Sequence, residues 1–182
     1  MNNIAILVPL KRFDVAKDRL RQGGTRDVTE LAQDLAREVV RSCAPRHVIV
    51  LSESDEVSEF ARTQNAEVFE SDARSLNEAV QLAYEKLGDQ FDQLIVVHGD
   101  LRNPGGLGNF APGDGVTIVT DHHQSGTNVL ALPTRTDFHF AYGANSKDQH
   151  RDEALRLGLE CRIIVASPWA FDVDEPGDLS TA

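Results

Sequence analysis

The sequence is poor in several features, and each shortage excludes a class of protein. Its 182 residues hold only two cysteines, Cys43 and Cys161, which lie far apart and outside any CxxC pattern. We therefore expect two reduced thiols in a cytoplasmic protein. No apolar run approaches the roughly 20 residues of a membrane span, and the opening Met-Asn-Asn lacks the basic stretch of a signal peptide. We expect no membrane partner.

Positive charge is also scarce. The chain has 18 Lys and Arg against 29 Asp and Glu, which gives a net charge of −11 and a pI near 4.9. Binding to DNA or RNA rests on a broad basic surface, so we expect no nucleic-acid partner. A small anionic ligand needs only a local basic pocket and is compatible with this composition.

Several motifs of known chemistry are missing. The sequence has no GxxxxGK[ST] P-loop. It also has no GxGxxG turn after the first strand, and this second absence argues against a dinucleotide-binding fold. No GxSxG or Cys–His pattern indicates nucleophilic catalysis. His98 and Asp100 could form a metal-binding pair, but no third ligand stands at a suitable spacing. His122 and His123 would face opposite ways on a strand, so a zinc site is not expected.

The scarce positive charge gathers at the start of the chain. The first 26 residues hold six Lys and Arg against two Asp, whereas the remaining 156 hold 12 against 27. This basic stretch directly follows the apolar run Ile4–Val8, which predicts a strand buried on both faces that stops at Pro9. Ligands of open α/β sheets bind beyond the carboxyl ends of the strands, so a phosphate is expected here.

Three side chains of this basic loop could neutralise a triphosphate: Lys11, Lys17 and Arg19. An ordinary solvated loop is the alternative interpretation of the same charges. We assign Arg12 and Arg21 to the surface.

Strands and helices alternate along the rest of the chain. Short apolar runs predict buried strands, and apolar residues at helical spacing predict helices that begin near Thr25 or Asp27, at Ser54, at Ser75, and at Ser146 or Asp148. The expected strands are Ile4–Val8, His47–Leu51, Ala66–Phe69, Asp92–His98, Gly115–Thr120, Thr127–Leu132 and Cys161–Val165. This alternation predicts an α/β three-layer sandwich with a mainly parallel sheet, and the section from Gly115 to Leu132 predicts one antiparallel excursion. No repeat or linker interrupts the chain, so we expect one domain.

Three carboxylates form a second candidate constellation. Asp100 ends a predicted buried strand after Gly99, whose missing side chain leaves room for a ligand, and Asp172 and Asp174 would point to one face of a strand. One or two carboxylates with phosphate oxygens and water can complete the octahedron of Mg²⁺. The alternative interpretations are a turn residue for Asp100 and a helix start for Asp174.

Glycines and hydroxyl residues make up a third candidate region, residues 125–128 and 142–146, with His150 beyond it. Glycine exposes backbone N–H groups and hydroxyls supplement them, which suits a phosphate or a carboxylate. Two turns and a helix cap are the alternative. Asn77, at the start of a predicted helix, is a candidate base or ribose contact, or else a neighbour of the cap.

Six motifs occur in one order along the chain: PLKRFDVAKDRL, SLNEAV, VVHGDL, SGTNVLAL, FAYGANSKDQH and FDVDEPGDL. Together they resemble the CofC/FbiD family of phospho-acid guanylyltransferases, which serve biosynthesis of the deazaflavin redox coenzyme and are related to the molybdenum-cofactor nucleotidyltransferases. The resemblance covers nearly the whole chain. It implies a Rossmann-like nucleotide-diphospho-sugar transferase fold and a single nucleotidyltransferase domain over residues 1–182.

The resemblance also implies a reaction. GMP would pass from GTP to the phosphate of 2-phospholactate, phosphoenolpyruvate or 3-phosphoglycerate, with release of pyrophosphate and with Mg²⁺ as cofactor. Lys17 and Asp100 would be the catalytic residues. The other implied roles are nucleotide binding by Lys11, Lys17, Arg19 and Asn77, acceptor binding by Thr127, Gly143, Ser146 and His150, and metal binding by Asp100, Asp172 and Asp174.

Two positions depart from the family pattern near the expected acceptor pocket. Arg102 stands where Pro usually follows Gly-Asp-Leu, and Ser125 stands where Gly is common. The acceptor and the exclusive use of GTP are therefore left open. The alternatives are a nucleotidyltransferase for another acceptor and a non-catalytic nucleotide-binding α/β domain. The sequence also leaves open whether the chain is a monomer or a homodimer.

Overall fold

The computed structural model describes residues 3–17, 20, 22, 27–174 and 178. Its strands are β1 (Ile4–Leu10), β2 (His47–Ser52), β3 (Glu67–Glu70), β4 (Gln93–Val97), β5 (Val116–Thr120), β6 (Thr127–Pro133) and β7 (Cys161–Ile164). Its α-helices are α2 (Val28–Ser42), α3 (Asp55–Thr63), α4 (Leu76–Leu87) and α5 (Ser146–Arg156), with two 3₁₀ turns, η1 (Leu107–Asn109) and η2 (Pro168–Ala170). None of the described helices is long and apolar enough to cross a membrane.

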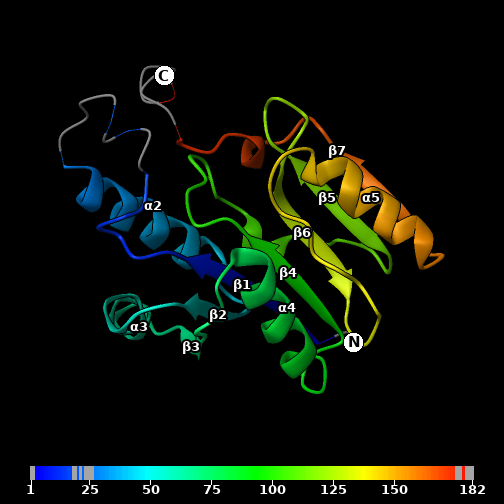
Figure 1. The fold of residues 1–182 in the computed structure, drawn as a ribbon, viewed down its shortest axis with the longest axis horizontal. Coiled ribbons are helices and arrows are strands. Elements are labelled where there is room, and N and C mark those ends of the chain that lie inside the picture. The colour runs from blue at the N-terminus through cyan, green and yellow to red at the C-terminus, as the bar shows by residue number, and fades with distance from the viewer. Residues whose placement is uncertain (1–2, 18–19, 21, 23–26, 175–177, 179–182) are drawn as a thin grey trace.

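The described strands form one seven-stranded sheet in the order β3-β2-β1-β4-β6-β5-β7 (Figure 1). Strands β1 to β4 are mutually parallel, and β7 is parallel to β5. β6 runs antiparallel to both of its neighbours, β4 and β5. The predicted mainly parallel sheet with one antiparallel excursion is confirmed, and β6 is the strand that reverses.

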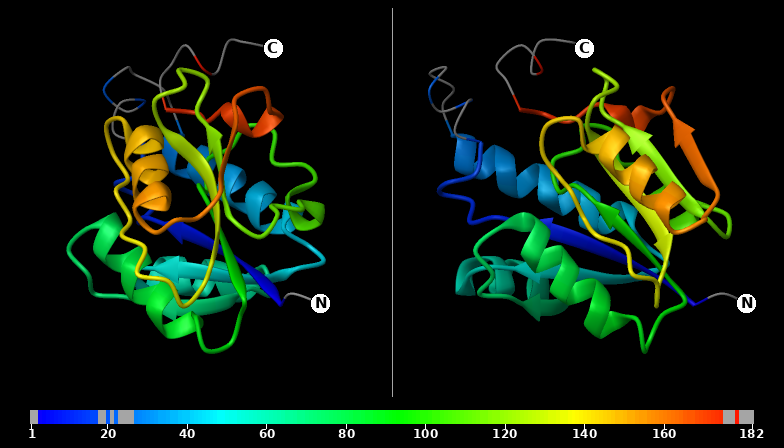
Figure 2. Two further views of the ribbon diagram at one scale, coloured as in Figure 1. Left: turned by 90° about the vertical axis from the view of Figure 1, so that its right-hand side faces the viewer. Right: turned by 45° about the vertical axis from the view of Figure 1, so that its right-hand side comes forward.

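Helices cover both faces of the sheet, because the apolar side chains of its strands point alternately to opposite sides. On β1, Ile6 and Val8 pack in the core under α2 and α3, whereas Ala5 and Leu7 pack in the core under α4 and α5. The left view of Figure 2 shows α4 and α5 together on one side of the sheet and α2 on the other. The predicted three-layer α/β sandwich is confirmed.

Two helix starts are capped as the sequence predicts. Ser54 Oγ accepts the N–H of the third residue of α3, and Ser75 Oγ accepts the N–H of the third residue of α4. Asp27 precedes α2, but its side chain makes no capping hydrogen bond and its φ is 55°. The alternative cap, Thr25, lies outside the described residues.

One predicted boundary was wrong, and the structure decides between two alternatives at another. β1 continues through Pro9 to Leu10, because beyond Leu7 it is hydrogen-bonded to β2 alone, and a proline is tolerated where one neighbouring strand is missing. Of the two predicted starts of α5, Ser146 is the correct one, and the residue before it, Asn145, has a φ of 57° and makes no side-chain cap.

Candidate functional site

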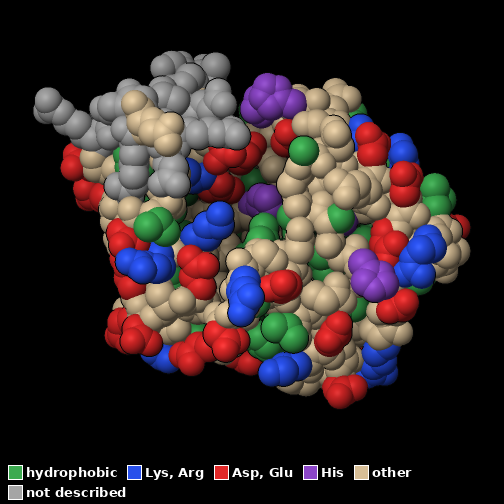
Figure 3. Space-filling model, viewed as in Figure 1, with side chains coloured by type: hydrophobic (Ala, Val, Ile, Leu, Met, Phe, Trp, Pro, Cys, Tyr) green, Lys and Arg blue, Asp and Glu red, His purple; other side chains and the backbone are tan. Residues whose placement is uncertain are grey.

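A cleft of about 550 Å³ opens at the edge of the sheet where β1, β2, β3 and β4 end. The chain leaves β1 for β2 on one side, whereas β4 lies on the other side, so the cleft sits where the strand order reverses. Ligands of open α/β sheets bind at this switch point. Figure 3 shows a hollow in the middle of this face, with basic and acidic side chains at its rim and a histidine inside. Lys11 and Lys17 of the basic loop both line this cleft, and the binding of a phosphate there stays a prediction.

Lys17 lies among the predicted metal ligands. Its Nζ donates a short hydrogen bond to Asp100 and a second one of 3.0 Å to Asp174 Oδ1. The Lys17 side chain is only 8% exposed, although the residue belongs to a loop. The φ of Lys17 is 63°, which is an uncommon backbone conformation for a lysine. The residue with this conformation is the one whose side chain lies between the carboxylates of Asp100 and Asp174.

The three carboxylates come from two segments, Asp100 from one and Asp172 and Asp174 from the other, which lie more than 70 residues apart in the sequence. Leu101 forms an isolated antiparallel bridge with Asp172, Arg102 N–H donates to Phe171 O at 2.8 Å, and Val173 N–H donates to Asp100 O at 3.1 Å. These backbone bonds bring one oxygen each of the three carboxylates, Asp100, Asp172 and Asp174, within 4.8 Å of one another. The predicted grouping of these three residues is confirmed as geometry, and their role as metal ligands stays a prediction.

The charges of the cluster are only partly balanced. Burial lowers the pKa of Lys17, but the carboxylates of Asp100 and Asp174 raise it by more, so the net shift is upward. Burial also raises the pKa of Asp100, and Lys17 and His98 outweigh it, so the pKa of Asp100 is lowered. Asp172 has a raised pKa because it is buried and faces the other two carboxylates.

The chemistry of this cluster fits a divalent cation. Lys17 compensates one of three carboxylate charges, which leaves two negative charges when all three groups are ionised. Asp100 Oδ1 is buried and has no hydrogen-bond partner among the described residues, so a strong acceptor is left without a donor. Carboxylate oxygens are the ligands that Mg²⁺ prefers. These residues could therefore hold Mg²⁺.

The other basic residues of the loop differ in placement. Lys11 is exposed and lines the cleft. Arg12 is on the surface as predicted: its half-exposed side chain pairs with Asp14, while its backbone N–H donates to Glu53. Arg19 and Arg21 lie outside the described residues.

The predicted acceptor residues Thr127, Ser146 and His150 form one buried network. Ala141 N–H donates to His150 Nε2 at 3.0 Å, so the ring proton is on Nδ1, which donates to Thr127 Oγ1 at 3.1 Å. Ser146 Oγ also donates to Thr127 Oγ1, at 3.2 Å. All three side chains are buried, and His150 is 0% exposed. Burial, followed by the charge of His98, lowers the pKa of His150 to about 4, so it is neutral.

Gly143, the fourth predicted acceptor residue, stands between this network and the preceding segment. Its φ is 128°, a conformation that residues with a side chain rarely adopt. Its carbonyl accepts the N–H of Ser146 at 3.2 Å. The structure therefore brings all four predicted acceptor residues together, and their contact with an acceptor stays a prediction.

One expectation, about free backbone N–H groups at Ser125 and Gly126, was wrong. The N–H groups of Ser125 and Gly126 both donate to Asp121 Oδ1 at 2.8 Å, so they are not available to an anion. A Cβ at Gly99 would overlap the side chain of Leu10. The missing side chain of Gly99 therefore leaves room for Leu10 of β1, and Gly99 itself also lines the cleft.

Asn77 has a use that the sequence did not indicate. Its Oδ1 accepts the N–H of Tyr142 at 2.7 Å, and its Nδ2 donates to the carbonyl of Tyr142 at 3.1 Å. Its neighbours Leu76 and Ala79 line the cleft, whereas Asn77 is not among the described residues that do so. A guanosine contact for Asn77 stays a prediction.

Sequence reasoning missed several polar residues of the cleft wall. They lie at or shortly after the carboxyl ends of β2, β3 and β4, and they are Ser52, Glu53, Ser71, Arg74 and His98. The signal that could have found them is the one that found Asp100, a polar residue just after a buried parallel strand. His98 was considered only as half of a metal pair, and in the structure its ring packs against Tyr142 with centroids 5.3 Å apart.

The chain is similar to known proteins of one family. A family described as "Guanylyl transferase CofC like" matches residues 4–181. A phosphoenolpyruvate guanylyltransferase of Sphaerobacter thermophilus is 32% identical over 197 residues, which cover 98% of this chain and 91% of that protein. A 2-phospho-L-lactate guanylyltransferase of Methanocaldococcus fervens is 22% identical, over 96% of this chain and 82% of that protein.

A solved structure supports the fold. A nucleotidyl transferase from Methanothermobacter thermautotroptrophicus superposes with a TM-score of 0.71 over 98% of this chain and 95% of that chain, at 16% identity. The expected Rossmann-like nucleotidyltransferase fold is confirmed. The family match spans nearly the whole chain and confirms the resemblance that the six motifs carry. The chain is a nucleotidyltransferase and belongs to the CofC-like family of guanylyltransferases.

Proposed function

We propose that this chain transfers GMP from GTP to the phosphate of a small phospho-carboxylic acid in deazaflavin coenzyme biosynthesis in the cytoplasm. Phosphoenolpyruvate and 2-phospholactate are the first candidate acceptors, because relatives are named for them, and 3-phosphoglycerate is the third. The observation that carries the proposal is the cluster of the carboxylates of Asp100, Asp172 and Asp174 beside the cleft, two of which, Asp100 and Asp174, pair with Lys17.

The reaction joins two anions. A phosphate oxygen of the acceptor attacks the α-phosphorus of GTP, the bond from that phosphorus to the bridging oxygen of the β-phosphate breaks, and pyrophosphate leaves with the bond's electron pair. Neutralising charge and holding the two phosphates in line can supply most of the catalysis. No protein nucleophile is required, which agrees with the absence of a nucleophile motif in the sequence.

We assign the donor side of this reaction to the basic loop. Lys11 and Lys17 would hold the triphosphate together with Arg19, which lies outside the described residues. Asp100, Asp172 and Asp174 would hold Mg²⁺, and the bound ion would offset negative charge on the phosphates of the donor. Lys17 would contact both the triphosphate and the carboxylates, because it lines the cleft and pairs with Asp100 and Asp174.

We assign the acceptor side to Thr127, Gly143 and Ser146, with His150 behind them. Thr127 Oγ1 accepts hydrogen bonds from His150 and Ser146, and its own proton has no acceptor among the described residues. One donor is therefore left over in a neutral network. A phosphate or a carboxylate of the acceptor would supply the missing oxygen.

Pyrophosphate release tests the proposal. The protein is mixed with each of the four NTPs and each of the three acids, with Mg²⁺ or with EDTA. We expect release with GTP, at least one acid and Mg²⁺ together, and none when any of the three is omitted.

Other outcomes identify the alternatives. Release with CTP but not GTP would indicate a nucleotidyltransferase for another donor and acceptor. Tight GTP binding without release from any pair would indicate a non-catalytic nucleotide-binding domain.

A further inference from the structure

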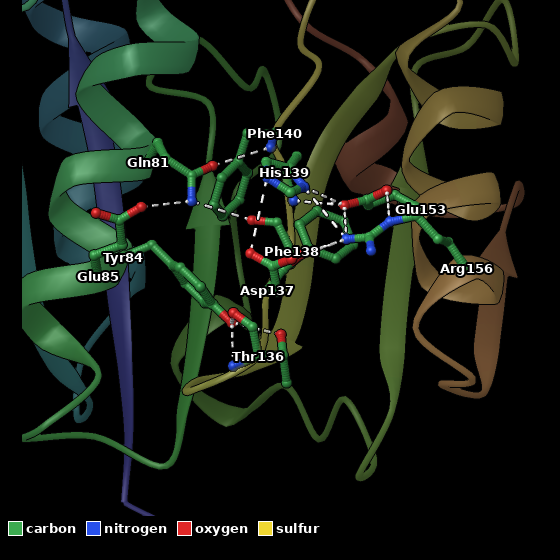
Figure 4. Close-up of polar contacts among 10 residues, drawn as sticks. All are labelled: Gln81, Tyr84, Glu85, Thr136, Asp137, Phe138, His139, Phe140, Glu153 and Arg156. Carbon is green, nitrogen blue, oxygen red and sulfur yellow. Dashed lines mark hydrogen bonds and ion pairs between the residues drawn. The ribbon is translucent and has the colours of Figure 1, made fainter.

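Residues 137–142 connect β6 to the region of α5 and pass between two helices (Figure 4). We call this segment the strut. Its polar backbone groups are not paired with another strand, although a strand-like segment needs such partners. Side chains of α4 and α5 bind them instead. The strut leads directly into Gly143 and the start of α5, where the acceptor residues lie.

Helix α4 binds the even-numbered residues of the strut through two amide side chains one turn apart. Gln81 Nε2 donates to Phe138 O at 3.2 Å, and Gln81 Oε1 accepts the N–H of Phe140 at 3.3 Å. Asn77 binds both backbone groups of Tyr142, at 2.7 Å and 3.1 Å. Residues four apart on a helix face the same way, so one face of α4 holds the whole length of the strut.

Helix α5 binds the odd-numbered residues from the opposite side. Glu153 Oε1 accepts the N–H of His139 at 2.9 Å, and His150 Nε2 accepts the N–H of Ala141 at 3.0 Å. Arg156 completes this side by donating to the carbonyl of Asp137. The strut is therefore fixed between the two helices, as Figure 4 shows for Gln81 on one side and Glu153 and Arg156 on the other.

Asn77 holds the end of the strut that matters for the acceptor. Tyr142 is the residue before Gly143, and the Gly143 carbonyl accepts the N–H of Ser146. Asn77 of α4 binds both backbone groups of Tyr142, so the position of Gly143 depends on that of α4. Leu76 and Ala79 of the same helix line the cleft, to which the proposed function assigns the nucleotide. Asn77 thus links the wall of the cleft to the acceptor residues. Both polar atoms of its amide are used for this link, because they bind the backbone of Tyr142.

We propose that Asn77 is a positioning residue for the acceptor. It sets the place of Gly143 and Ser146 relative to the nucleotide cleft and does not contact the guanosine. This inference rests on the proposed function, because that function places the acceptor at Gly143 and Ser146.

The test compares Asn77→Ala with a matched variant, Gln81→Ala. Both variants remove an amide of α4 that makes two hydrogen bonds to the strut, but only Asn77 binds the residue next to Gly143. We measure KM for GTP, KM for the acceptor, and the dissociation constant of GTP by calorimetry without acceptor. We expect Asn77→Ala to raise the acceptor KM about tenfold and to leave both GTP constants within about twofold. Gln81→Ala should leave all three within about twofold.

Two kinetic outcomes would overturn the inference. A weakened GTP dissociation constant with an unchanged acceptor KM in Asn77→Ala would place Asn77 at the guanosine. We call the two hydrogen bonds between Asn77 and the backbone of Tyr142 the clamp. An equal rise of the acceptor KM in both variants would mean that the strut as a whole, and not the clamp, determines acceptor binding.

Amide hydrogen exchange without substrates tests the clamp even if the proposed reaction fails. Asn77→Ala should speed exchange at residues 142–146, and Gln81→Ala at residues 138–140. Unchanged exchange at residues 142–146 in Asn77→Ala would overturn the positioning role whatever the enzyme's activity. Lost protection there, together with no pyrophosphate release by the wild-type protein, would support the clamp and reject the proposed function alone.

Discussion

The protein has two groups of polar side chains, the carboxylate cluster with Lys17 and the network at the starts of β6 and α5, and they differ in how completely their polar atoms are hydrogen-bonded. In the first, three carboxylates lie together and only two of them pair with Lys17, and a buried oxygen of Asp100 has no hydrogen-bond partner among the described residues. In the second, Thr127, Ser146 and His150 are neutral and hydrogen-bonded to one another in the interior. The first group has the unbalanced charge that a cation and a triphosphate would complete, whereas the second is nearly complete without a ligand.

The difference indicates how each group would act. Unpaired charge beside a cleft costs free energy in the protein alone, and a ligand can recover it. A satisfied network instead fixes the geometry of its surroundings. We therefore expect substitutions in the first group to act on turnover and ligand binding, and substitutions in the second to act on stability and acceptor position.

The largest effect is expected for Asp100→Asn. The variant keeps the shape of the side chain but removes a charge that faces Lys17 and the predicted metal, so turnover should fall by about 10³-fold or more. Pyrophosphate release measures it, and circular dichroism should show an unchanged fold. Asp114→Asn, at an exposed position, is the control and should have wild-type activity. Near-normal turnover in Asp100→Asn would remove Asp100 from the site.

The second prediction concerns pH and His150. The unfolded chain protonates this histidine near pH 6.5 and the folded chain only near pH 4, because the ring is buried. Below pH 6.5 the unfolded state therefore binds more protons, and stability should fall as the pH drops from 6.5 to 4, by on the order of 3 kcal/mol in total.

Urea unfolding across this range measures the effect of His150. Other groups titrate as well, so the quantity of interest is the difference between the wild-type protein and His150→Gln, which lacks this titration. If both proteins lose the same free energy of unfolding, His150 is not held neutral by its surroundings.

Lys17→Ala should have an intermediate effect. It removes a charge that we assign to the triphosphate, so the KM for GTP should rise about tenfold, which corresponds to about 1.4 kcal/mol. Removing the lysine also leaves the carboxylates uncompensated, so Mg²⁺ should raise the melting temperature of this variant more than that of the wild-type protein. A GTP dependence equal to that of the wild-type protein would exclude Lys17 from nucleotide binding.

The smallest effect is expected for Arg12→Ala in the same loop. Its side chain pairs with Asp14 at the surface, where both groups are about half exposed. Exposed ion pairs contribute little to stability, so the melting temperature and the KM for GTP should stay close to the wild-type values. A loss of GTP use as large as that of Lys17→Ala would show that the whole loop binds the nucleotide.

Much of the fold was predictable because its signals are local. The caps at Ser54 and Ser75 act over three residues, and buried strands such as His47–Ser52 are apolar runs that need no partner to be recognised. The charge surplus at the start of the chain and its place after β1 also singled out the loop whose Lys11 and Lys17 line the cleft. Boundaries such as the end of β1 were missed, because they depend on which strand lies alongside.

The site was predictable only as far as residue type and the family resemblance reach. The sequence and its motifs named Asp100, Asp172 and Asp174, but the Leu101–Asp172 bridge, formed between distant segments, brings them within 4.8 Å. The sequence could not show that Asn77 clamps a residue 65 positions away or that both ring nitrogens of His150 are engaged. Helix propensity, capping and charge act within a few residues, so the sequence alone determined the elements and the basic loop. Hydrogen bonding and burial depend on which segments the sheet brings side by side, so only the tertiary structure decided which polar groups are satisfied and which are left for ligands.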